Sequence, residues 1–325
     1  MDFSFTKEAW PIAGTFTISR GSKTEAMVVT ASVHHEGRTG HGECVPYAHY
    51  SETVESVIAA LERASKDLHL PADHSRLQAL MPAGAARNAM DCALWDLRAK
   101  LVGKRVWDML GLAEPKPVAT AFTLSVAAPD EMREKARANA HRPLLKLKLA
   151  GDDDLDRVRA VREGAPETAI IVDANEGWQE SHYRTLVPAL KDLGVAAIEQ
   201  PFPAGAEEML TSLQRPIPVI ADESCHTAAD IRRLATLYDG VNIKLDKSGG
   251  LTEALKMREE AIKHGLQIMV GCMVGTSLAM APAMLLTAGA GFVDLDGPLL
   301  LARDREPGLT FKGSTVGAPP AALWG

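Results

Sequence analysis

The sequence predicts an α/β protein, a TIM-type parallel (β/α) barrel preceded by an N-terminal α+β capping domain. From about Val118 onward, short apolar runs alternate with longer segments whose apolar residues recur every three to four positions, as in amphipathic helices. Regular alternation of strand and helix builds a parallel barrel. The residues before this point do not follow the same rhythm, so we expect them to form a separate domain.

The predicted capping domain covers residues 1–114. It begins with the strand-like runs AMVVTASVHH and TGHGECVPY and continues into the helical segments ETVESVIAALERASKDL and GAARNAMDCALWDLRAKL. Pro115 and Pro117 mark the junction with the barrel at 115–299, because a proline restrains the residue before it from helix. The tail at 300–325 is rich in glycine and proline, and we expect it to pack back on the capping domain.

Eight barrel strands can be assigned between the junction and the tail. In chain order they are AFTLSV, LLKLKLA, AIIVDAN, AAIEQP, PVIADES, GVNIKL, LQIMVGCM and FVDLD. Between them lie segments such as DDLDRVRAVREGA and LTEALKMREEAIKHG, which have the periodicity of amphipathic helices. We therefore expect strand and helix to alternate eight times.

Composition excludes several functional classes. The chain has 4 cysteines and no C-x-x-C pair, which argues against a disulfide framework or a zinc site. No segment reaches the roughly 18 apolar residues of a membrane span, and the N-terminus lacks a signal-peptide pattern. No Lys/Arg-rich run provides the basic footprint that nucleic acid needs. We expect a cytoplasmic protein with reduced thiols, and a homo-oligomer is compatible with the sequence.

Charged residues stand at the ends of the predicted strands, where a solvated charge has no obvious reason to be. They are Lys146 and Lys148 on strand two, Asp173 on three, Glu199 on four, Asp222 on five, Lys244 on six, and Asp294 with Asp296 on eight. Barrels of this type collect their reactive groups at the C-terminal ends of the strands. The pattern therefore predicts an active site spread over successive strands.

Three of these acids point to a metal. Asp173, Glu199 and Asp222 lie on adjacent strands and can converge on one hard cation. Oxygen-only ligation favours Mg²⁺ over zinc, with Mn²⁺ as a substitute. In a ring of eight strands, strands two and six are diametrically opposed, so two lysines would face each other across this cation.

Strand alternation places Lys146 and Lys148 on the same side of their strand. A neighbouring cation and burial both lower the pKa of a lysine, and a general base must be neutral. A reduction by roughly 2 to 3 units from about 10.4 would make Lys148 a base near neutral pH. Taken singly, each charge is explained as well by solvent or by an ion pair between loops. The ordered combination favours an active site.

At these residues the chain resembles the enolase superfamily, in particular its muconate-lactonizing subgroup and, within that, the dipeptide epimerases. The matching segments are GECVPY and PAGAARNAMDCALWDL in the first domain, then KLK, VDAN, EQP, ADESCHT, VNIKLDKSGGLTEAL, GCM and DLDGP. They cover nearly the whole chain. The resemblance implies a modified TIM-type (β/α)7β barrel with an N-terminal α+β capping domain, and a magnesium-dependent isomerase.

The resemblance also implies residue roles. Asp173, Glu199 and Asp222 would bind Mg²⁺ and so stabilise the enediolate formed when the α-proton of the substrate leaves. Lys148 and Lys244 would be the two acid/base catalysts on opposite faces, which makes the reaction a two-base 1,1-proton transfer. Lys146 would hydrogen-bond the substrate carboxylate and depress the pKa of its neighbour. Lys247 competes with Lys244 as the second base, but Lys244 lies in the strand, as the lysine of the family does.

Further positions narrow the substrate. Asp294 and Asp296 would receive the α-ammonium group of a dipeptide, and Thr123 resembles a position that contacts substrate. The segment ISRGSKTEA resembles in place a specificity loop over the active site, where Arg20 or Lys23 would pair with a side-chain carboxylate of the substrate. The expected substrate is L-Ala-D/L-Glu or a related dipeptide, and the expected role is in recycling cell-wall (peptidoglycan) peptides.

Two alternatives stay open at this point. The same fold and metal would serve an o-succinylbenzoate synthase, an N-succinylamino acid racemase or a muconate cycloisomerase. None of these needs a paired-acid site for an ammonium group, so Asp294 and Asp296 favour the dipeptide epimerase. The second alternative is a binding protein that uses the barrel without catalysis, and the presence of all five core metal and lysine positions disfavours it.

Overall fold

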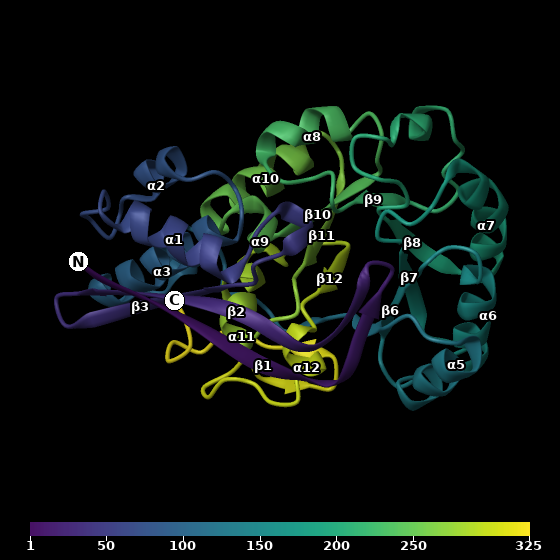
Figure 1. The fold of residues 1–325 in the computed structure, drawn as a ribbon, viewed down its shortest axis with the longest axis horizontal. Helices are drawn as coiled ribbons and strands as arrows, with labels where there is room; N and C mark the ends of the chain where they lie inside the picture. The colour runs from purple at the N-terminus through teal and green to yellow at the C-terminus, as the bar shows by residue number, and fades with distance from the viewer.

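The computed structural model describes residues 1–325 and contains a barrel and a separate antiparallel sheet domain (Figure 1). The barrel sheet has eight strands in the order β12-β11-β10-β9-β8-β7-β6-β5, all paired in parallel. A backbone hydrogen bond from Ala121 N to Val293 O at 2.8 Å helps to bring the ring nearly to closure. The predicted barrel is therefore confirmed.

All eight predicted barrel strands are present. They are β5 (Phe122–Leu124), β6 (Leu144–Lys148), β7 (Ala169–Asp173), β8 (Val195–Glu199), β9 (Val219–Ala221), β10 (Gly240–Lys244), β11 (Gln267–Gly271) and β12 (Phe292–Asp294). Between them lie α5 (Pro129–Ala138), α6 (Asp154–Gly164), α7 (Glu180–Asp192), α8 (Ala228–Leu234), α9 (Leu245–Ser248), α10 (Leu251–Lys263), α11 (Ser277–Ala283) and η3 (Met284–Leu286). A short helix, α12 (Gly297–Leu300), follows the last strand.

The expectation of eightfold strand and helix alternation is wrong at one connection. Between β8 and β9 the only helical element is the 3₁₀ turn η2 (Glu208–Thr211). Four prolines lie in this connection, at Pro201, Pro203, Pro216 and Pro218. Proline removes a backbone donor and disfavours helix in the residue before it, so these prolines limit any helix to the stretch between Pro203 and Pro216.

The N-terminal domain is a three-stranded antiparallel sheet in the order β1-β2-β3, with helices packed against it. Its elements are β1 (Asp2–Ile18), β2 (Gly21–His35), β3 (Arg38–Cys44), η1 (Ala48–Tyr50), α1 (Val54–Ser65), α2 (His74–Leu80), α3 (Ala85–Val102) and α4 (Val106–Met109). Helix α3 lies directly on β3: a Cβ added at Gly42 would be 2.2 Å from Ala89 O. The glycines of the GHGEC run thus permit close packing of helix on strand.

The segment 18–26 is not a loop between two shorter strands, as the sequence suggested. Strand β1 continues to Ile18 and β2 resumes at Gly21, so the segment is the tip of a long β-hairpin. This hairpin reaches from the N-terminal sheet to the barrel (Figure 1), where Val126 N donates to Thr17 O at 3.1 Å. The hairpin therefore carries residues of the first domain to the barrel strand ends.

The C-terminal tail contacts both parts of the molecule. Strands β13 (Phe311–Lys312) and β14 (Thr315–Val316) form a small sheet with β4 (Val118–Ala119). Beyond it, Trp324 Nε1 donates to Cys92 O at 2.9 Å, and Gly325 N donates to Asp96 Oδ1 at 2.8 Å, both on α3. The tail thereby ties the last residues of the chain to the N-terminal domain.

None of the helices combines the length and the apolar character that a membrane-spanning helix needs.

Candidate active site

The site is built by strand alternation inside the barrel. Ile171, Ala197 and Ile220 form part of a small apolar cluster inside the barrel. Each lies two positions before an acid, so Asp173, Glu199 and Asp222 point to the same interior, one layer nearer the strand ends. An apolar floor with charged groups above it is the arrangement typical of barrel active sites.

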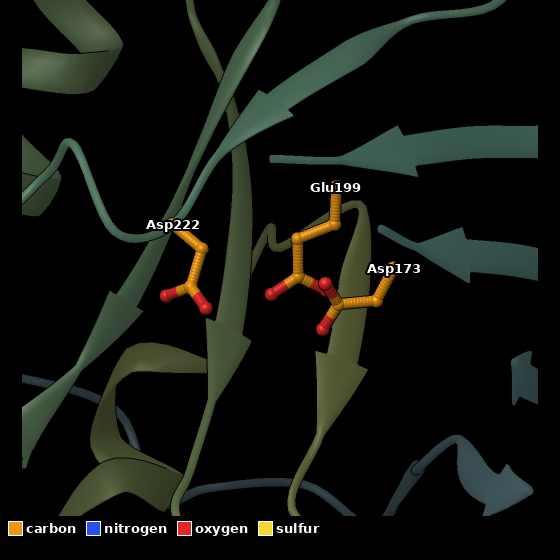
Figure 2. A group of neighbouring side chains, drawn as sticks. All are labelled: Asp173, Glu199 and Asp222. Atoms are coloured by element: carbon orange, nitrogen blue, oxygen red, sulfur yellow. The ribbon is translucent and has the colours of Figure 1, made fainter. Parts of the chain in front are cut away.

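The three acids converge, as the sequence predicted. Figure 2 shows the carboxylates of Asp173, Glu199 and Asp222 turned toward one another from neighbouring strands. One oxygen atom from each lies within 4.8 Å of the others, and all three residues are buried. Three carboxylates packed this closely repel one another, so the cluster requires positive charge.

Lys146 supplies part of this charge. Its Nζ lies 2.5 Å from Glu199 Oε2, 3.2 Å from Asp173 Oδ2 and 2.8 Å from Asp294 Oδ2. Burial lowers the pKa of Lys146, but the carboxylates of Asp294, Glu199 and Asp173 more than offset it and hold the pKa well above its usual value. Lys146 is therefore a permanent cation at the centre of the site.

Lys148 and Lys244 lie on opposite walls. Three strands separate β6 from β10 on one side of the ring (β7, β8, β9), and three on the other (β11, β12, β5). Lys148 Nζ is 2.6 Å from Asp173 Oδ2, and Lys244 Nζ is 2.7 Å from Asp222 Oδ2. Burial lowers the pKa of Lys244, whereas Asp222 and Glu199 raise it, and the net pKa lies above its ordinary value.

Lys247, the competitor for the second base, has a different environment. Its side chain is fully buried, donates to Asn242 O at 3.1 Å and to Asp222 O, and lies 2.6 Å from Asp222 Oδ1. Lys148 and Lys244 line the cavity above the site, and Lys247 does not. The geometry thus favours Lys244 as the lysine that reaches a ligand.

The donor set fits a hard divalent cation. Burial and the nearby Asp173 carboxylate raise the pKa of Glu199 to about 7, although Lys146 opposes this. Burial also raises the pKa of Asp222, but Lys244 and Lys247 outweigh it and hold that pKa well below its usual value. All three candidate ligands are buried carboxylates, and none offers nitrogen or sulfur. Mg²⁺ and Mn²⁺ prefer such a set of oxygen ligands.

The two acids of the DLD run and Thr123 lie together across the barrel from the triad. Thr123 N donates to Asp296 Oδ2 at 2.7 Å, which joins β5 to the end of β12. Burial and Asp294 raise the pKa of Asp296 to about 7. Asp294 Oδ1 is buried and accepts no hydrogen bond. All three residues line the cavity.

Arg20 reaches the barrel but is already paired. From the tip of the β1–β2 hairpin, its guanidinium lies 3.1 Å from Glu176 Oε2 and 2.7 Å from Glu223 Oε1, and it also donates to Asn175 O at 2.8 Å. Lys23 makes no ion pair; its Nζ lies over the Tyr47 ring, 5.1 Å from the centroid, and burial lowers its pKa. Arg20 therefore holds the hairpin tip on the barrel, and Lys23 is the uncommitted cation.

A cavity of about 950 Å³ connects these groups. Its walls include both candidate bases, Asp222, the acids of β12 and both cations of the hairpin tip. Residues of the hairpin and residues around Tyr47 also line it, so both domains contribute to its walls. The volume suits a small molecule of dipeptide size.

The sequence reasoning missed several residues of the site. Asn242 Nδ2 donates to Glu199 Oε1 at 2.7 Å from inside β10, and its position two residues before Lys244 was the available signal. Glu176 and Glu223, which hold Arg20, follow the strand ends that carry Asp173 and Asp222. Their partner is 156 and 203 residues away in the chain, so no local pattern could reveal the pairing.

Sequence comparison places both domains in a known enzyme family. Residues 1–111 match the N-terminal domain of the mandelate racemase / muconate lactonizing enzyme family, and residues 130–304 match the enolase C-terminal domain-like family. The chain is 44% identical over 307 residues to L-Ala-D/L-Glu epimerase of Escherichia coli (strain K12), covering 94% of this chain and 96% of the relative. It is also 44% identical over 288 residues to N-acetyl-D-glutamate racemase of a Pseudoalteromonas species, covering 88% and 91%.

Solved structures show the same similarity. An enolase family member from Agrobacterium tumefaciens, with bound sodium and L-Ala-L-Glu, superposes with a TM-score of 0.95 at 50% identity and 99% coverage of both chains. A dipeptide epimerase from Methylococcus capsulatus, complexed with Mg and L-Arg-D-Lys, gives a TM-score of 0.90 at 30% identity, covering 98% of this chain and 96% of that one. Both domains match this family, and the Escherichia coli relative aligns over nearly the whole chain. This chain therefore belongs to the mandelate racemase / muconate lactonizing enzyme family of the enolase superfamily.

Proposed function

We propose that this protein is a Mg²⁺-dependent dipeptide epimerase that inverts the α-carbon of the C-terminal residue of L-Ala-D/L-Glu or a close analogue. The observation that carries the proposal is the placement of Lys148 and Lys244 on opposite walls of one cavity, with three carboxylates between them. Opposed acid/base groups are what inversion at a single carbon requires. The similarity to an L-Ala-D/L-Glu epimerase supports this choice.

Asp173, Glu199 and Asp222 would hold the cation. A bound Mg²⁺ supplies positive charge that stabilises negative charge on the oxygens of the substrate carboxylate. Lys146, which stays protonated, adds a hydrogen-bond donor for the same carboxylate. Both positive groups favour the negatively charged state that follows loss of the α-proton.

The two lysines divide the proton transfer. In its neutral form Lys148 accepts the α-proton from one face, and the α-carbon becomes planar. In its protonated form Lys244 then delivers a proton to the opposite face, which gives the other epimer. For the reverse reaction the roles exchange, and each lysine begins in the protonation state in which it ended the forward turnover.

The acids of β12 define the other end of the substrate. Asp294 and Asp296 face the cavity and would receive the α-ammonium group of the N-terminal residue. No protein group donates a hydrogen bond to the buried Asp294 Oδ1, so this oxygen is available to an ammonium group of the substrate. Thr123, through its backbone amide, fixes the Asp296 carboxylate in place.

A second candidate substrate is an N-acyl glutamate, favoured by the 44% identity to an N-acetyl-D-glutamate racemase. The chemistry at the α-carbon is the same, but such a substrate has no ammonium group. The paired acids of β12 would then have no cation to bind, so the structure favours the dipeptide. o-Succinylbenzoate synthesis and muconate cycloisomerisation are disfavoured on the same ground.

The two substrates can be separated with one variant. Asp296→Asn keeps an acceptor for Thr123 N but removes the negative charge that Asp296 carries above its pKa of about 7, so the comparison is made at pH 8. For a dipeptide epimerase, kcat/KM for L-Ala-L-Glu falls at least about tenfold, while any turnover of N-acetyl-L-Glu is unchanged or rises. If the wild type prefers N-acetyl-L-Glu and the variant turns over both substrates as the wild type does, the dipeptide assignment is wrong.

The cellular setting is part of the proposal. L-Ala-D-Glu is a fragment of cell-wall peptide, so the enzyme would act in the recycling of peptidoglycan peptides in the cytoplasm. Deletion of the gene should then leave L-Ala-D-Glu as an unusable nutrient, whereas growth on L-Ala-L-Glu should be unaffected. Equal growth of the deletion strain on both dipeptides would argue against this role.

A further inference from the structure

Gln200, which directly follows the metal-site acid Glu199, has an unusually complete set of contacts. Its side chain is fully buried. Oε1 accepts hydrogen bonds from Asp222 N at 2.8 Å and from Ser224 N at 3.3 Å. Nε2 lies 2.8 Å from Phe202 O, 2.9 Å from Ser224 Oγ and 3.0 Å from Tyr238 Oη. One amide therefore joins the end of β8, the end of β9 and the turn before β10.

The backbone of Gln200 is strained in a way that these contacts explain. Its φ is 35°, although it is not a glycine and it precedes Pro201, where an extended conformation is preferred. Such a conformation persists only when its surroundings over-determine it. Here Gln200 N donates to Ile220 O, and Gln200 O accepts from Glu176 N, both at 2.9 Å. Main chain and side chain are thus both fixed.

The consequence falls on two of the three acids. Glu199 is the residue before Gln200, so the φ of Gln200 sets the direction in which β8 ends beside its carboxylate. Asp222 N, in turn, is held by Gln200 Oε1. The distance between the Glu199 and Asp222 carboxylates therefore depends on a residue that does not itself face the cavity.

We infer that Gln200 is a positioning residue that sets the spacing of Glu199 and Asp222 and thereby the affinity of the site for its divalent cation. The inference rests on the proposed function, since it takes the three acids as the metal ligands. Substitution of residues that hydrogen-bond and orient metal ligands typically lowers metal affinity or activity by about 10–100-fold. Gln200 acts through the two acids and does not touch substrate.

The test measures Mn²⁺ binding by electron paramagnetic resonance of the free ion, independently of turnover. In Gln200→Met, which has similar length and no hydrogen-bonding group, the Mn²⁺ dissociation constant should rise about 10–100-fold. The kcat at saturating Mg²⁺ should stay within about fivefold of the wild type, because the lysines are untouched. Unchanged Mn²⁺ affinity, or a kcat that saturating Mg²⁺ does not restore, overturns the inference.

Tyr238→Phe is the matched control. It removes one oxygen near Nε2 but leaves the contact between Oε1 and Asp222 N. Its Mn²⁺ affinity should stay within about threefold of the wild type, and an equal loss in both variants would indicate a general structural effect and overturn the inference. Should Gln200→Met fold poorly, Gln200→Asn, too short to reach the Asp222 amide, should weaken Mn²⁺ binding in the same way. If the wild type itself binds no Mn²⁺, the metal assignment of the proposed function fails instead.

Discussion

Lys146 Nζ lies 2.8 Å from Asp294 Oδ2. Lys146, two residues before the proposed base Lys148 on β6, thus contacts the proposed ammonium site on β12 directly. The same Nζ also contacts two of the three acids of the metal site. One cation thus links the ends of the site at which the two halves of a dipeptide would bind. Substrate binding and metal binding should both depend on it.

Lys146→Met should separate these two effects. Without the cation, Asp173 and Glu199 lose a positive neighbour, so Mn²⁺ should bind more tightly than in the wild type. Turnover should fall at least about 100-fold, because the substrate carboxylate loses its charged donor. Metal titration and kcat/KM measure the two effects, and weaker Mn²⁺ binding in a folded variant would contradict the charge assignment.

Variants of the two proposed bases should differ in the epimer whose α-proton they still exchange with solvent. Lys148→Ala and Lys244→Ala should each abolish epimerisation while the circular dichroism spectrum stays that of the wild type. Since each lysine serves one face of the α-carbon, each variant should still exchange the α-proton with D₂O for one epimer, and the two variants for opposite epimers. Mass spectrometry of L-Ala-L-Glu and L-Ala-D-Glu measures this exchange. Robust epimerisation by Lys244→Ala would overturn the assignment of Lys244 as the second base, and Lys247 would then be the next candidate.

The cations of the hairpin tip should differ in their effects. Lys23→Ala should raise KM for L-Ala-L-Glu but leave KM for L-Ala-L-Leu unchanged, because only the first substrate has a side-chain carboxylate for the uncommitted cation. Arg20→Ala should raise KM for both dipeptides, since it releases the tip from Glu176 and Glu223. The reverse pattern, in which only Arg20→Ala discriminates between the substrates, would return Arg20 to the role of direct contact that the sequence suggested.

Asp246, which follows β10, predicts a pH dependence of stability. It is buried between the domains and accepts hydrogen bonds from Val45 N and Asn88 Nδ2, and burial raises its pKa from 3.8 to about 7. Because the folded state holds a proton that the unfolded state has lost, stability falls as pH rises from about 4 to 7 and the carboxyl ionises in place. One pKa unit corresponds to about 1.4 kcal/mol, so the change amounts to a few kcal/mol.

The isosteric variant Asp246→Asn tests this dependence. It keeps an oxygen for both donors and has no charge to bury, so urea unfolding should give a smaller loss of stability between pH 5 and pH 8 than in the wild type. The variant should also be the more stable protein at pH 8. Parallel pH curves for the two proteins would show that Asp246 does not titrate in this range.

Periodicity and strand-end chemistry were enough to predict the barrel and its charged centre. Each of Asp173, Glu199, Asp222 and Lys244 ends an apolar run, and strand order alone places them in space. The same reasoning failed where a structure depends on distant partners. The hairpin tip is held on the barrel by Glu176 and Glu223, more than 150 residues away. Gln200 is likewise held by Ser224 and Tyr238. The prolines on both sides of η2 limit the stretch in which a helix could form, and this was the only signal in the sequence that the connection differs from the others.

The most direct test of the proposed function is the incubation of the wild-type protein with L-Ala-L-Glu and Mg²⁺ in D₂O. We predict that L-Ala-D-Glu forms, that it carries deuterium at the α-carbon of glutamate, and that EDTA abolishes both changes until Mg²⁺ is restored. If a folded, Mg²⁺-loaded protein gave neither the epimer nor α-deuterium from L-Ala-L-Glu or from any member of a dipeptide panel, the assignment of this site as a dipeptide epimerase would be contradicted.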